Sequence, residues 1–349
     1  MIAVILLSVA TLLVGLELHW HGPDWPIAVK LVGVAALTLA NLLAAALLMK
    51  PCIPRDDDDP QRRVRRIVHY AYLRPMLPAI ALVTLQAQVW LLGWPLLAQR
   101  FVSLSDTAPS LFVLAGLLPV VVGVVLAWVP MYLAERELRA TPISMGQYLL
   151  YRFRTQVLFV LAPLAVIIAL SDLVDYLAWQ YPRWQGEIVM GGGLGVFAVA
   201  VFLFPLAVRF IWPTRPMPAG EVRSMLEDLC RKTGVGVREI LLWRTPGRAV
   251  TNAAVLGFVA PMRFILVTDG LIQAMTVGEQ QAVFAHELGH VRKHHIPYLA
   301  MLVVIFLGLI ELLSGVVPMP EWAIGPSGVT GGEGLWGLVA AAVAAGVYG

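Results

Sequence analysis

The sequence predicts a polytopic α-helical membrane protein that carries one small cytoplasmic α+β domain. Hydrophobic residues make up 59% of the 349 residues and charged residues only 13%, whereas a soluble domain has about 25% charged residues. The apolar residues gather in runs long enough to cross a bilayer, and charged residues return between Trp212 and His295. These runs indicate a lipid bilayer as partner. The net charge of +3 is small for this length, so we expect no nucleic acid as partner.

The apolar runs predict the membrane-spanning helices. Such a helix needs about 20 mostly apolar residues. The first run lacks the basic start and the cleavage site of a signal peptide, so it is interpreted as a span. The last run, 335–349, is too short to cross, so we expect a chain truncated inside an eighth helix. The predicted spans are Ile2 to Leu18, Ile27 to Met49, Met76 to Ala98, Leu111 to Leu133, Val157 to Leu177, Ile188 to Ile211 and Ile296 to Val317.

These runs divide the chain into three regions. We expect a six-helix transmembrane region at 1–211, a domain outside the lipid at 212–295, and a seventh span with the incomplete eighth at 296–349. Loops rich in Lys and Arg stay in the cytoplasm, which places the amino terminus and the domain at 212–295 on the cytoplasmic side of the inner membrane. The residues that mark the two basic loops are Lys50, Arg55, Arg62, Arg63, Arg65, Arg66 and Arg74, and then Arg136, Arg139, Arg152 and Arg154.

Short elements can be read in the domain at 212–295. An amphipathic helix is predicted at Glu221 to Thr233, because its apolar residues form one stripe and Gly234 follows as a stop signal. Strands are predicted at Arg238 to Trp243 and at Arg263 to Thr268. A turn at Asp269-Gly270 should lead into a helix that begins near Val277.

That last helix contains His286-Glu287-Leu288-Gly289-His290. Two histidines one helical turn apart put both imidazoles on one face, where they can bind a single zinc ion. The glutamate between them can take a proton from the water that the zinc activates. The motif therefore predicts a zinc peptidase whose metal ligands include His286 and His290 and whose general base is Glu287.

The region from Glu221 to Leu299 resembles the integral-membrane zinc peptidases that include HtpX and the type I CAAX prenyl endopeptidase. The matching residues are Thr251-Asn252-Ala253, Leu266 to Leu271, Glu279, Ala282 to His290, and His294. The resemblance implies a zincin-like catalytic domain, one zinc ion, and the same roles for His286, Glu287 and His290. It also implies a third ligand, a glutamate on a later helix in a Glu-x-x-x-Asp pattern.

No glutamate after His290 fits that third position. Glu311 lies about 31 Å along a continuous helix at 1.5 Å per residue, whereas a zinc–carboxylate bond is about 2 Å. Glu321 and Glu333 follow a complete span and should lie on the other side of the membrane. We therefore expect the third ligand to be a glutamate beyond Gly349, and the chain as printed to have an incomplete site.

Other polar residues have ordinary structural interpretations. In a continuous helix His294 would stand about 12 Å from His286, so it is interpreted as a polar residue at the helix end or as a hydrogen-bond donor to a metal ligand. His295 is interpreted as a surface residue. Cys52 and Cys230 match no disulfide or metal pattern. Lys30 and Asp172 should reach the membrane interface, and Asp56 to Asp59 should form a solvated loop. Gln86, Gln88 and Glu311 either line a water-filled chamber or form hydrogen bonds between helices.

The expected reaction is hydrolysis of peptide bonds in a protein or peptide substrate, either for quality control or for CAAX-type processing. Strand Phe264 to Thr268, or the segment around Asn252-Ala253, would hold the substrate backbone by edge pairing. Two alternatives remain open. One is a sensor of the BlaR/MecR type, in which an outer domain switches the peptidase, and the other is a membrane scaffold that binds no metal.

Overall fold

The computed structural model describes residues 7, 8, 12, 22–54, 59–101, 112–139, 143–246, 250–294, 298, 301 and 305. These residues form two compact units, one that ends at Val160 and one that begins at Leu161. The predicted boundary at residue 211 lies inside the second unit, between its helices and its sheet, and the three-region division stays a prediction.

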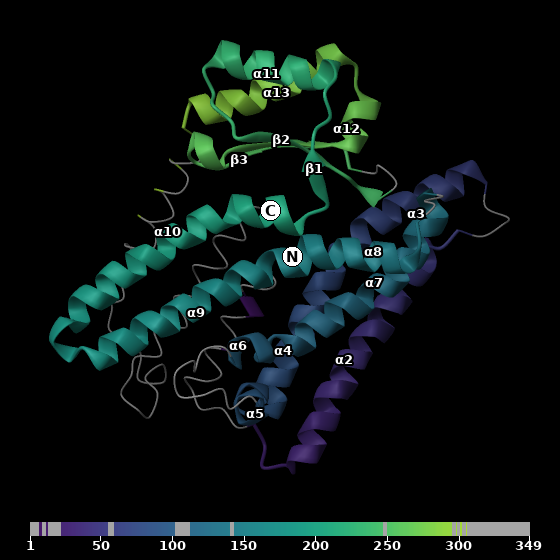
Figure 1. Cartoon of the computed structure of the whole chain (residues 1–349). Helices are drawn as coiled ribbons and strands as arrows, with labels where there is room; N and C mark the ends of the chain where they lie inside the picture. The colour runs from purple at the N-terminus through teal and green to yellow at the C-terminus, as the bar shows by residue number, and fades with distance from the viewer. Residues whose placement is uncertain are drawn as a thin grey trace. The chain divides into compact units, whose positions relative to one another are not determined.

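The first unit is helical (Figure 1). Its elements are α2 (Ile27–Met49), η1 (Lys50–Cys52), α3 (Pro60–Leu73), α4 (Met76–Leu92), α5 (Trp94–Phe101), α6 (Phe112–Gly116), α7 (Leu118–Arg139), α8 (Met145–Arg152) and the π-helical turn η3 (Phe153–Leu158). The second unit contains α9 (Phe159–Gln180) from Leu161 on, η4 (Pro182–Trp184), α10 (Gln185–Ile211), β1 (Thr214–Pro216), α11 (Glu221–Thr233), β2 (Glu239–Trp243), β3 (Ala253–Leu256), η6 (Ala260–Met262), β4 (Phe264–Thr268), α12 (Asp269–Ala274) and α13 (Val277–Arg292).

Five helical segments in the described part of the chain are long and apolar enough to cross a membrane: Ile27–Cys52, Pro60–Leu92, Val113–Leu138, Met145–Gln180 and Pro182–Ile211. They correspond to the second through sixth predicted spans. The predicted first and seventh spans, the run at 335–349 and the acidic residues 56–58 lie outside the described residues, apart from a few isolated positions.

Two span predictions differ from the structure in detail. The third span does not continue to Ala98, because α4 ends at Leu92 and Gly93 adopts a left-handed conformation with φ of 63°. Glycine takes this conformation without steric cost, which makes it a natural helix stop. Lys30 and Asp172 are buried instead of reaching the interface. Lys30 lies on the same stripe of α2 as the buried Val34 and Asn41, so its position on the helix turns it inward.

Polar side chains connect the helices of the first unit. The Gln88 amide on α4 donates hydrogen bonds to the Val34 carbonyl, at 3.1 Å, and to the Thr38 hydroxyl, at 2.9 Å, both on α2. Gln86 accepts a hydrogen bond from the Trp90 indole, at 3.0 Å. Hydrogen bonding between helices, and not a chamber lining, is therefore the interpretation that Gln88 supports.

The second unit contains a four-stranded sheet of order β1-β2-β4-β3. Strand β2 pairs antiparallel with β1 and parallel with β4, and β3 pairs antiparallel with β4. Helices α11 and α13 lie together on one face of this sheet, as Figure 1 shows. Their apolar side chains and those of the strands form one core, in which Leu226, Ile265, Phe284 and Leu288 are fully buried.

The sequence predicts β2, β4, α11 and α13 to within a residue or two, but it misses β1 and β3. Both are short, with three and four residues, and such short strands show too little alternation to be recognised. The predicted turn at Asp269-Gly270 is instead the first turn of α12, which Thr268 caps by accepting a hydrogen bond from the Leu271 amide.

The two cysteines are buried and unpaired. Burial raises the pKa of the Cys230 thiol on α11, and the nearby Glu227 carboxylate raises this pKa further. A thiol of raised pKa is a poor nucleophile and a poor metal ligand. These positions therefore agree with the structural role predicted for both cysteines.

The last helical turn of α10 is attached to the sheet by two contacts. The Arg209 guanidinium lies 3.3 Å from the Glu239 carboxylate at the start of β2. The rings of Trp212 and Trp243, at the ends of α10 and β2, stack with centroids 4.4 Å apart. Because the sheet begins directly after the span, these contacts hold it next to the end of α10.

We predict that Thr268→Val loosens β3. The buried Thr268 hydroxyl accepts a hydrogen bond from the Asn252 amide, at 2.9 Å, and donates one to the Asn252 carbonyl, at 3.0 Å. Valine keeps the shape but leaves the amides of Asn252 and Leu271 without this acceptor, which costs about 1–3 kcal/mol. Hydrogen exchange of the amides at 252, 254 and 256 should therefore become about 5- to 150-fold faster. The exposed Thr251→Val is the matched control, and equal exchange in both variants would contradict the assigned role.

Candidate metal centre

Helix α13 begins with a capping box. The Thr276 hydroxyl accepts a hydrogen bond from the Glu279 amide, at 3.4 Å, and the Glu279 carboxylate accepts one from the Thr276 amide, at 2.8 Å. Two backbone N–H groups that have no partner inside the helix are satisfied in this way. The bonds from Thr276 lower the pKa of the Glu279 carboxyl group. The helix that carries the motif therefore has a well-defined first turn.

One face of α13 packs into the core. Gln280, Phe284 and Leu288 are buried at a spacing of four residues, which places them on one stripe of the helix. The Gln280 amide also donates hydrogen bonds to the carbonyls of Ile272, at 3.2 Å, and Met275, at 2.8 Å. These contacts determine both the position of the helix along its axis and its rotation about that axis.

The rotation leaves the motif side chains at the edge of the packed stripe. His286 is exposed, whereas Glu287 and His290 are half-buried. The Nε2 atoms of His286 and His290 lie 3.0 Å apart, and the two rings are nearly perpendicular, at 87°. Two nitrogen ligands that share a tetrahedral zinc ion at 2.0–2.1 Å lie about 3.3 Å apart. The two imidazoles therefore fit one shared metal ion.

Glu287 is the neighbour of His286 in the chain and points about 100° away from it around the helix. Within the described part of the protein, its carboxylate makes no hydrogen bond and no ion pair. A half-buried carboxylate with no protein partner is available to accept a proton from a bound water molecule. This arrangement suits the general base that the motif predicts.

Among the described residues, no third His, Cys, Asp or Glu side chain joins the histidine pair. The rejected candidates Glu311, Glu321 and Glu333 lie outside the described residues, as does His295. The third ligand, expected at a glutamate beyond Gly349, stays a prediction. The described residues thus offer two imidazoles as candidate ligands of a metal ion.

His294 does not lie in the continuous helix that its predicted distance from His286 assumed, but it does lie at the helix end, as predicted. Helix α13 ends at Arg292, and His294 adopts a left-handed conformation with φ of 57°. Its Nδ1 atom lies 2.9 Å from the Arg292 carbonyl oxygen. His294 is therefore a polar residue at the helix end, and it leaves the helical repeat that carries His286 and His290.

The strand that can receive an extended peptide is β3. Strand β4 is paired on both sides, with β2 and with β3, so the prediction that Phe264 to Thr268 offers a free edge is wrong. Strand β3 lies at the end of the sheet and next to α13. The alternative segment around Asn252-Ala253 leads directly into this edge strand.

Along an antiparallel pair of strands, every second residue forms backbone hydrogen bonds with the neighbouring strand. The hydrogen bond from the Thr268 amide to the Asn252 carbonyl, at 3.1 Å, shows that Asn252 is one of these residues. The backbone N–H and C=O groups of Ala254 and Leu256 therefore point toward β4. Those of Ala253 and Val255 point away from β4, toward the outer edge of the sheet. The Asn252 side chain accepts a hydrogen bond from the Ala253 amide, at 2.9 Å. Among the described residues, the backbone N–H and C=O groups of Val255 have no partner at this edge.

The end of β3 is held by a tight turn and an arginine. Gly257 has φ of 107°, and a Cβ atom there would lie 2.2 Å from the Met262 carbonyl oxygen, so only glycine fits. The Arg263 guanidinium donates hydrogen bonds to the carbonyls of Gly236, at 2.9 Å, and Phe258, at 2.7 Å. These local signals, Asn252 before the strand and Gly257 after it, are what could have revealed β3 in the sequence.

The fold and the paired histidines define a multi-pass membrane protein with a metallopeptidase-type unit. Residues 216–321 match the model of peptidase family M48. A protease HtpX homolog of Bacteroides fragilis is 26% identical over 129 residues, which are 36% of this chain and 39% of that protein. Protease HtpX of Yersinia enterocolitica is 28% identical over 38% of this chain and 47% of its own length.

Two further similarities are to proteins of Saccharomyces species. CAAX prenyl protease 1 of Saccharomyces cerevisiae is 29% identical over 30% of this chain and 22% of its own length. The crystal structure of S. mikatae Ste24p is similar in fold, with a TM-score of 0.51 and 18% identity over 83% of this chain and 73% of that one. The chain therefore contains a segment, residues 216–321, that matches peptidase family M48. It is similar in sequence to HtpX proteases and CAAX prenyl protease 1 and similar in fold to Ste24p, and the sequence matches span less than half the length of these curated relatives.

The capping box predicts a specific pH dependence of stability. Because the folded state lowers the pKa of Glu279, the ionised carboxylate stabilises the fold fully above its unfolded pKa of about 4.3. This contribution is lost as the pH falls through the lower pKa of the folded state. The melting temperature of the wild-type chain should exceed that of Glu279→Gln at pH 7, and the difference should shrink toward pH 3. A difference that grows as the pH falls would contradict the bond pattern.

Proposed function

We propose that this protein is a membrane-embedded zinc metalloendopeptidase. The observation that carries the proposal is the pair of imidazole nitrogens 3.0 Å apart on α13. The Glu287 carboxylate next to them has no partner among the described residues, and β3, the outer strand of the described sheet, lies alongside. Zinc is the metal that this donor set favours, since imidazole nitrogen is a common zinc ligand in catalytic sites and the His-Glu-x-x-His spacing suits it.

The residues divide the work as follows. His286 and His290 would hold the zinc ion, which when bound would supply Lewis acidity to a water molecule and to the scissile carbonyl group. Glu287 takes a proton from the attacking water and passes it to the departing amine. As this carboxylate is free of protein partners among the described residues, it can turn toward the water without breaking an existing bond.

The substrate is an extended segment of a protein or peptide that pairs with β3. The N–H and C=O groups of Val255 would bind its backbone, and main-chain pairing of this type is largely independent of sequence. Proteins of the membrane that have lost their fold, or that carry a processing signal, offer such segments. The similarity to HtpX and to CAAX prenyl protease 1 supports this class of substrate.

The positions of Lys and Arg support a cytoplasmic active site at the inner membrane. The loops after the second and fourth predicted spans are basic, and basic loops stay in the cytoplasm. Two crossings after the second basic loop return the chain to that side at Ile211. A peptidase unit that follows Ile211 directly would act on substrates that are in the membrane or leave it toward the cytoplasm.

We predict that Glu287→Gln separates metal binding from catalysis. In a full-length version that supplies the expected third ligand, the variant should keep stoichiometric zinc, measured by mass spectrometry of the purified protein, because both imidazoles remain. Cleavage of a fluorescently labelled unfolded protein should fall about 10²- to 10⁴-fold, because the general base is lost. His286→Ala and His290→Ala should lose zinc as well as activity.

The matched control is His294→Asn, which changes a histidine outside the pair and keeps a residue that tolerates positive φ. This variant should retain both zinc and activity. Zinc loss in His294→Asn equal to that in His290→Ala would contradict the two-ligand assignment. A wild-type protein that binds no zinc at all would favour the scaffold alternative.

The edge strand is tested by Val255→Pro, which removes the amide that faces the free edge. Proline is tolerated on edge strands where no ladder bond is lost, so zinc content should be unchanged. Turnover of the labelled protein should fall about tenfold, because one backbone hydrogen bond to the substrate is missing. Val255→Ala removes a similar volume but keeps the amide, and it should retain most of the activity. Equal losses in both variants would sink the pairing model.

A further inference from the structure

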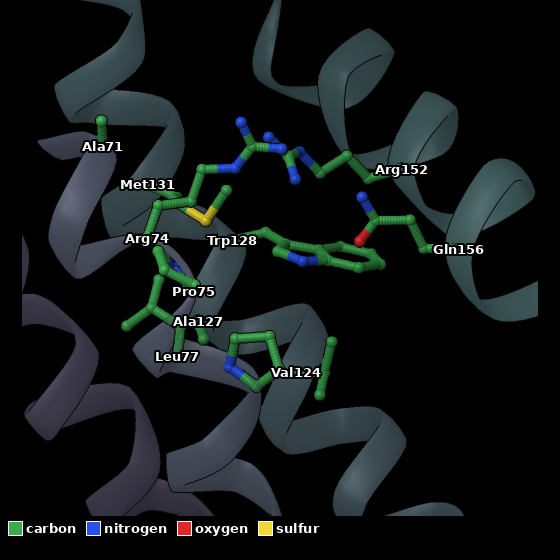
Figure 2. A pocket seen from close by; sticks show the side chains of 11 residues that line it. Ala71, Arg74, Pro75, Leu77, Val124, Ala127, Trp128, Met131, Arg152 and Gln156 are labelled. Carbon is green, nitrogen blue, oxygen red and sulfur yellow. The ribbon is translucent and has the colours of Figure 1, made fainter. Parts of the chain in front are cut away.

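A cavity of about 380 Å³ lies within the first unit, away from the histidine pair in the sequence. The junction of α3 and α4 supplies Arg74 and Leu77, α7 supplies Trp128 and Met131, and the segment that follows supplies Arg152 at the end of α8 and Gln156 in the π-helical turn η3. Figure 2 shows the side chains of Arg74 and Arg152 reaching toward one another from opposite walls, above the Trp128 ring.

The position of Arg152 is held by a buried polar cluster. Its guanidinium lies 3.3 Å from the Glu135 carboxylate, with both side chains largely buried. The same carboxylate oxygen accepts hydrogen bonds from the hydroxyls of Tyr70, at 3.1 Å, and Tyr148, at 2.8 Å. The Arg152 guanidinium also lies 4.8 Å from the centroid of the Tyr148 ring. The group is therefore fixed in place before any ligand arrives.

Arg74 adds a second positive charge to the same cavity. Its side chain is exposed and forms no ion pair with any described residue, and no Asp or Glu of the described part of the chain lines the cavity. The negative charge of Glu135 compensates the positive charge of Arg152. The cavity therefore has a net positive charge, which comes from Arg74. Two guanidinium groups that converge on one space, together with the Gln156 carboxamide, present many N–H donors to an anion with several oxygens.

The rest of the cavity is apolar. Leu77, Trp128 and Met131 form its buried part. Close in sequence to the lining residues, the large apolar side chains of Tyr72, Met76, Leu150 and Phe153 are exposed. A soluble anion needs no such surroundings, whereas the glycerol and acyl groups of a lipid do.

We propose that this cavity binds the phosphate group of a phosphate ester, and that an anionic phospholipid is its source. Arg74 and Arg152 belong to the two clusters of basic residues from which the sequence predicts the cytoplasmic side, although both lie in helical segments of the structure. The cytoplasmic leaflet is rich in anionic lipids, and basic pockets between transmembrane helices bind their headgroups. This site is independent of the peptidase proposal and concerns how the protein sits in its membrane.

The test compares the purified full chain in nanodiscs of phosphatidylcholine alone and of phosphatidylcholine with phosphatidylglycerol. Phosphatidylglycerol should raise the melting temperature, and lipids released from the protein should be enriched in it. Arg74→Gln should weaken this binding about tenfold, because it removes a charge-assisted contact. Arg152 is unsuitable as the first variant, since its loss would leave Glu135 buried without its partner.

The matched control is Arg65→Gln, on α3 but outside the cavity. It removes the same charge, so general attraction to an anionic surface falls equally in both variants. A third arm adds inorganic phosphate to the phosphatidylcholine nanodiscs. Stabilisation by inorganic phosphate that Arg74→Gln abolishes would support the phosphate site and make a soluble ester its source. Equal responses of Arg74→Gln and Arg65→Gln in every arm would overturn the proposal.

Discussion

The packing of Phe284 and Leu288 into the core of the second unit determines where the two histidines point. Both side chains are fully buried, and burying a side chain of this kind contributes about 1.5–3 kcal/mol. Since each residue of a helix is rotated about 100° from the one before it, this anchoring also fixes the directions of positions 286, 287 and 290. The face that we propose to bind metal thus depends on apolar contacts that include none of its own residues.

The same sheet that buries those side chains also supplies the free edge. Strand β4 is fully buried and paired on both sides, so β3 becomes the outer strand. Thr268 joins the start of β3 to the start of α12 through its hydroxyl group, and Gly257 closes the other end of the strand in a tight turn. A short strand with only four residues is held in position by these contacts at its two ends.

In the first unit, buried polar side chains are stabilised by hydrogen bonds and ion pairs with other helices. In a membrane, a polar group without a partner costs several kcal/mol. The Gln88 NH₂ group meets this demand with two acceptors on α2, whereas its Oε1 atom has no partner among the described residues. Glu135 meets this demand with Arg152 and two tyrosine hydroxyls. The group around Glu135 differs from the group around Gln88 because one of its members, Arg152, also lines a cavity. One residue is thereby both a structural partner and a potential ligand-binding group.

Much of the local structure could be predicted from residue patterns. Five spans, α11, β2, β4, α13 and the pairing of His286 with His290 follow from periodicity and spacing, which depend on neighbours within one or two helical turns. The edge role of β3 could not be predicted, and the sequence favoured β4 equally, because strand order depends on which segments pair across long sequence separations. The inward position of Lys30 was missed for a similar reason, since charge argued for the interface while helix packing decided burial.

By itself, the order of the residues specified the helices, the motif and the kind of chemistry it suits. Those features depend on interactions between residues close together in the chain. Which strand is free, which arginines converge on one cavity, and that His294 leaves the helix were decided only when distant segments packed together. Packing depends on the shape and burial of whole elements, and no local pattern contains that information.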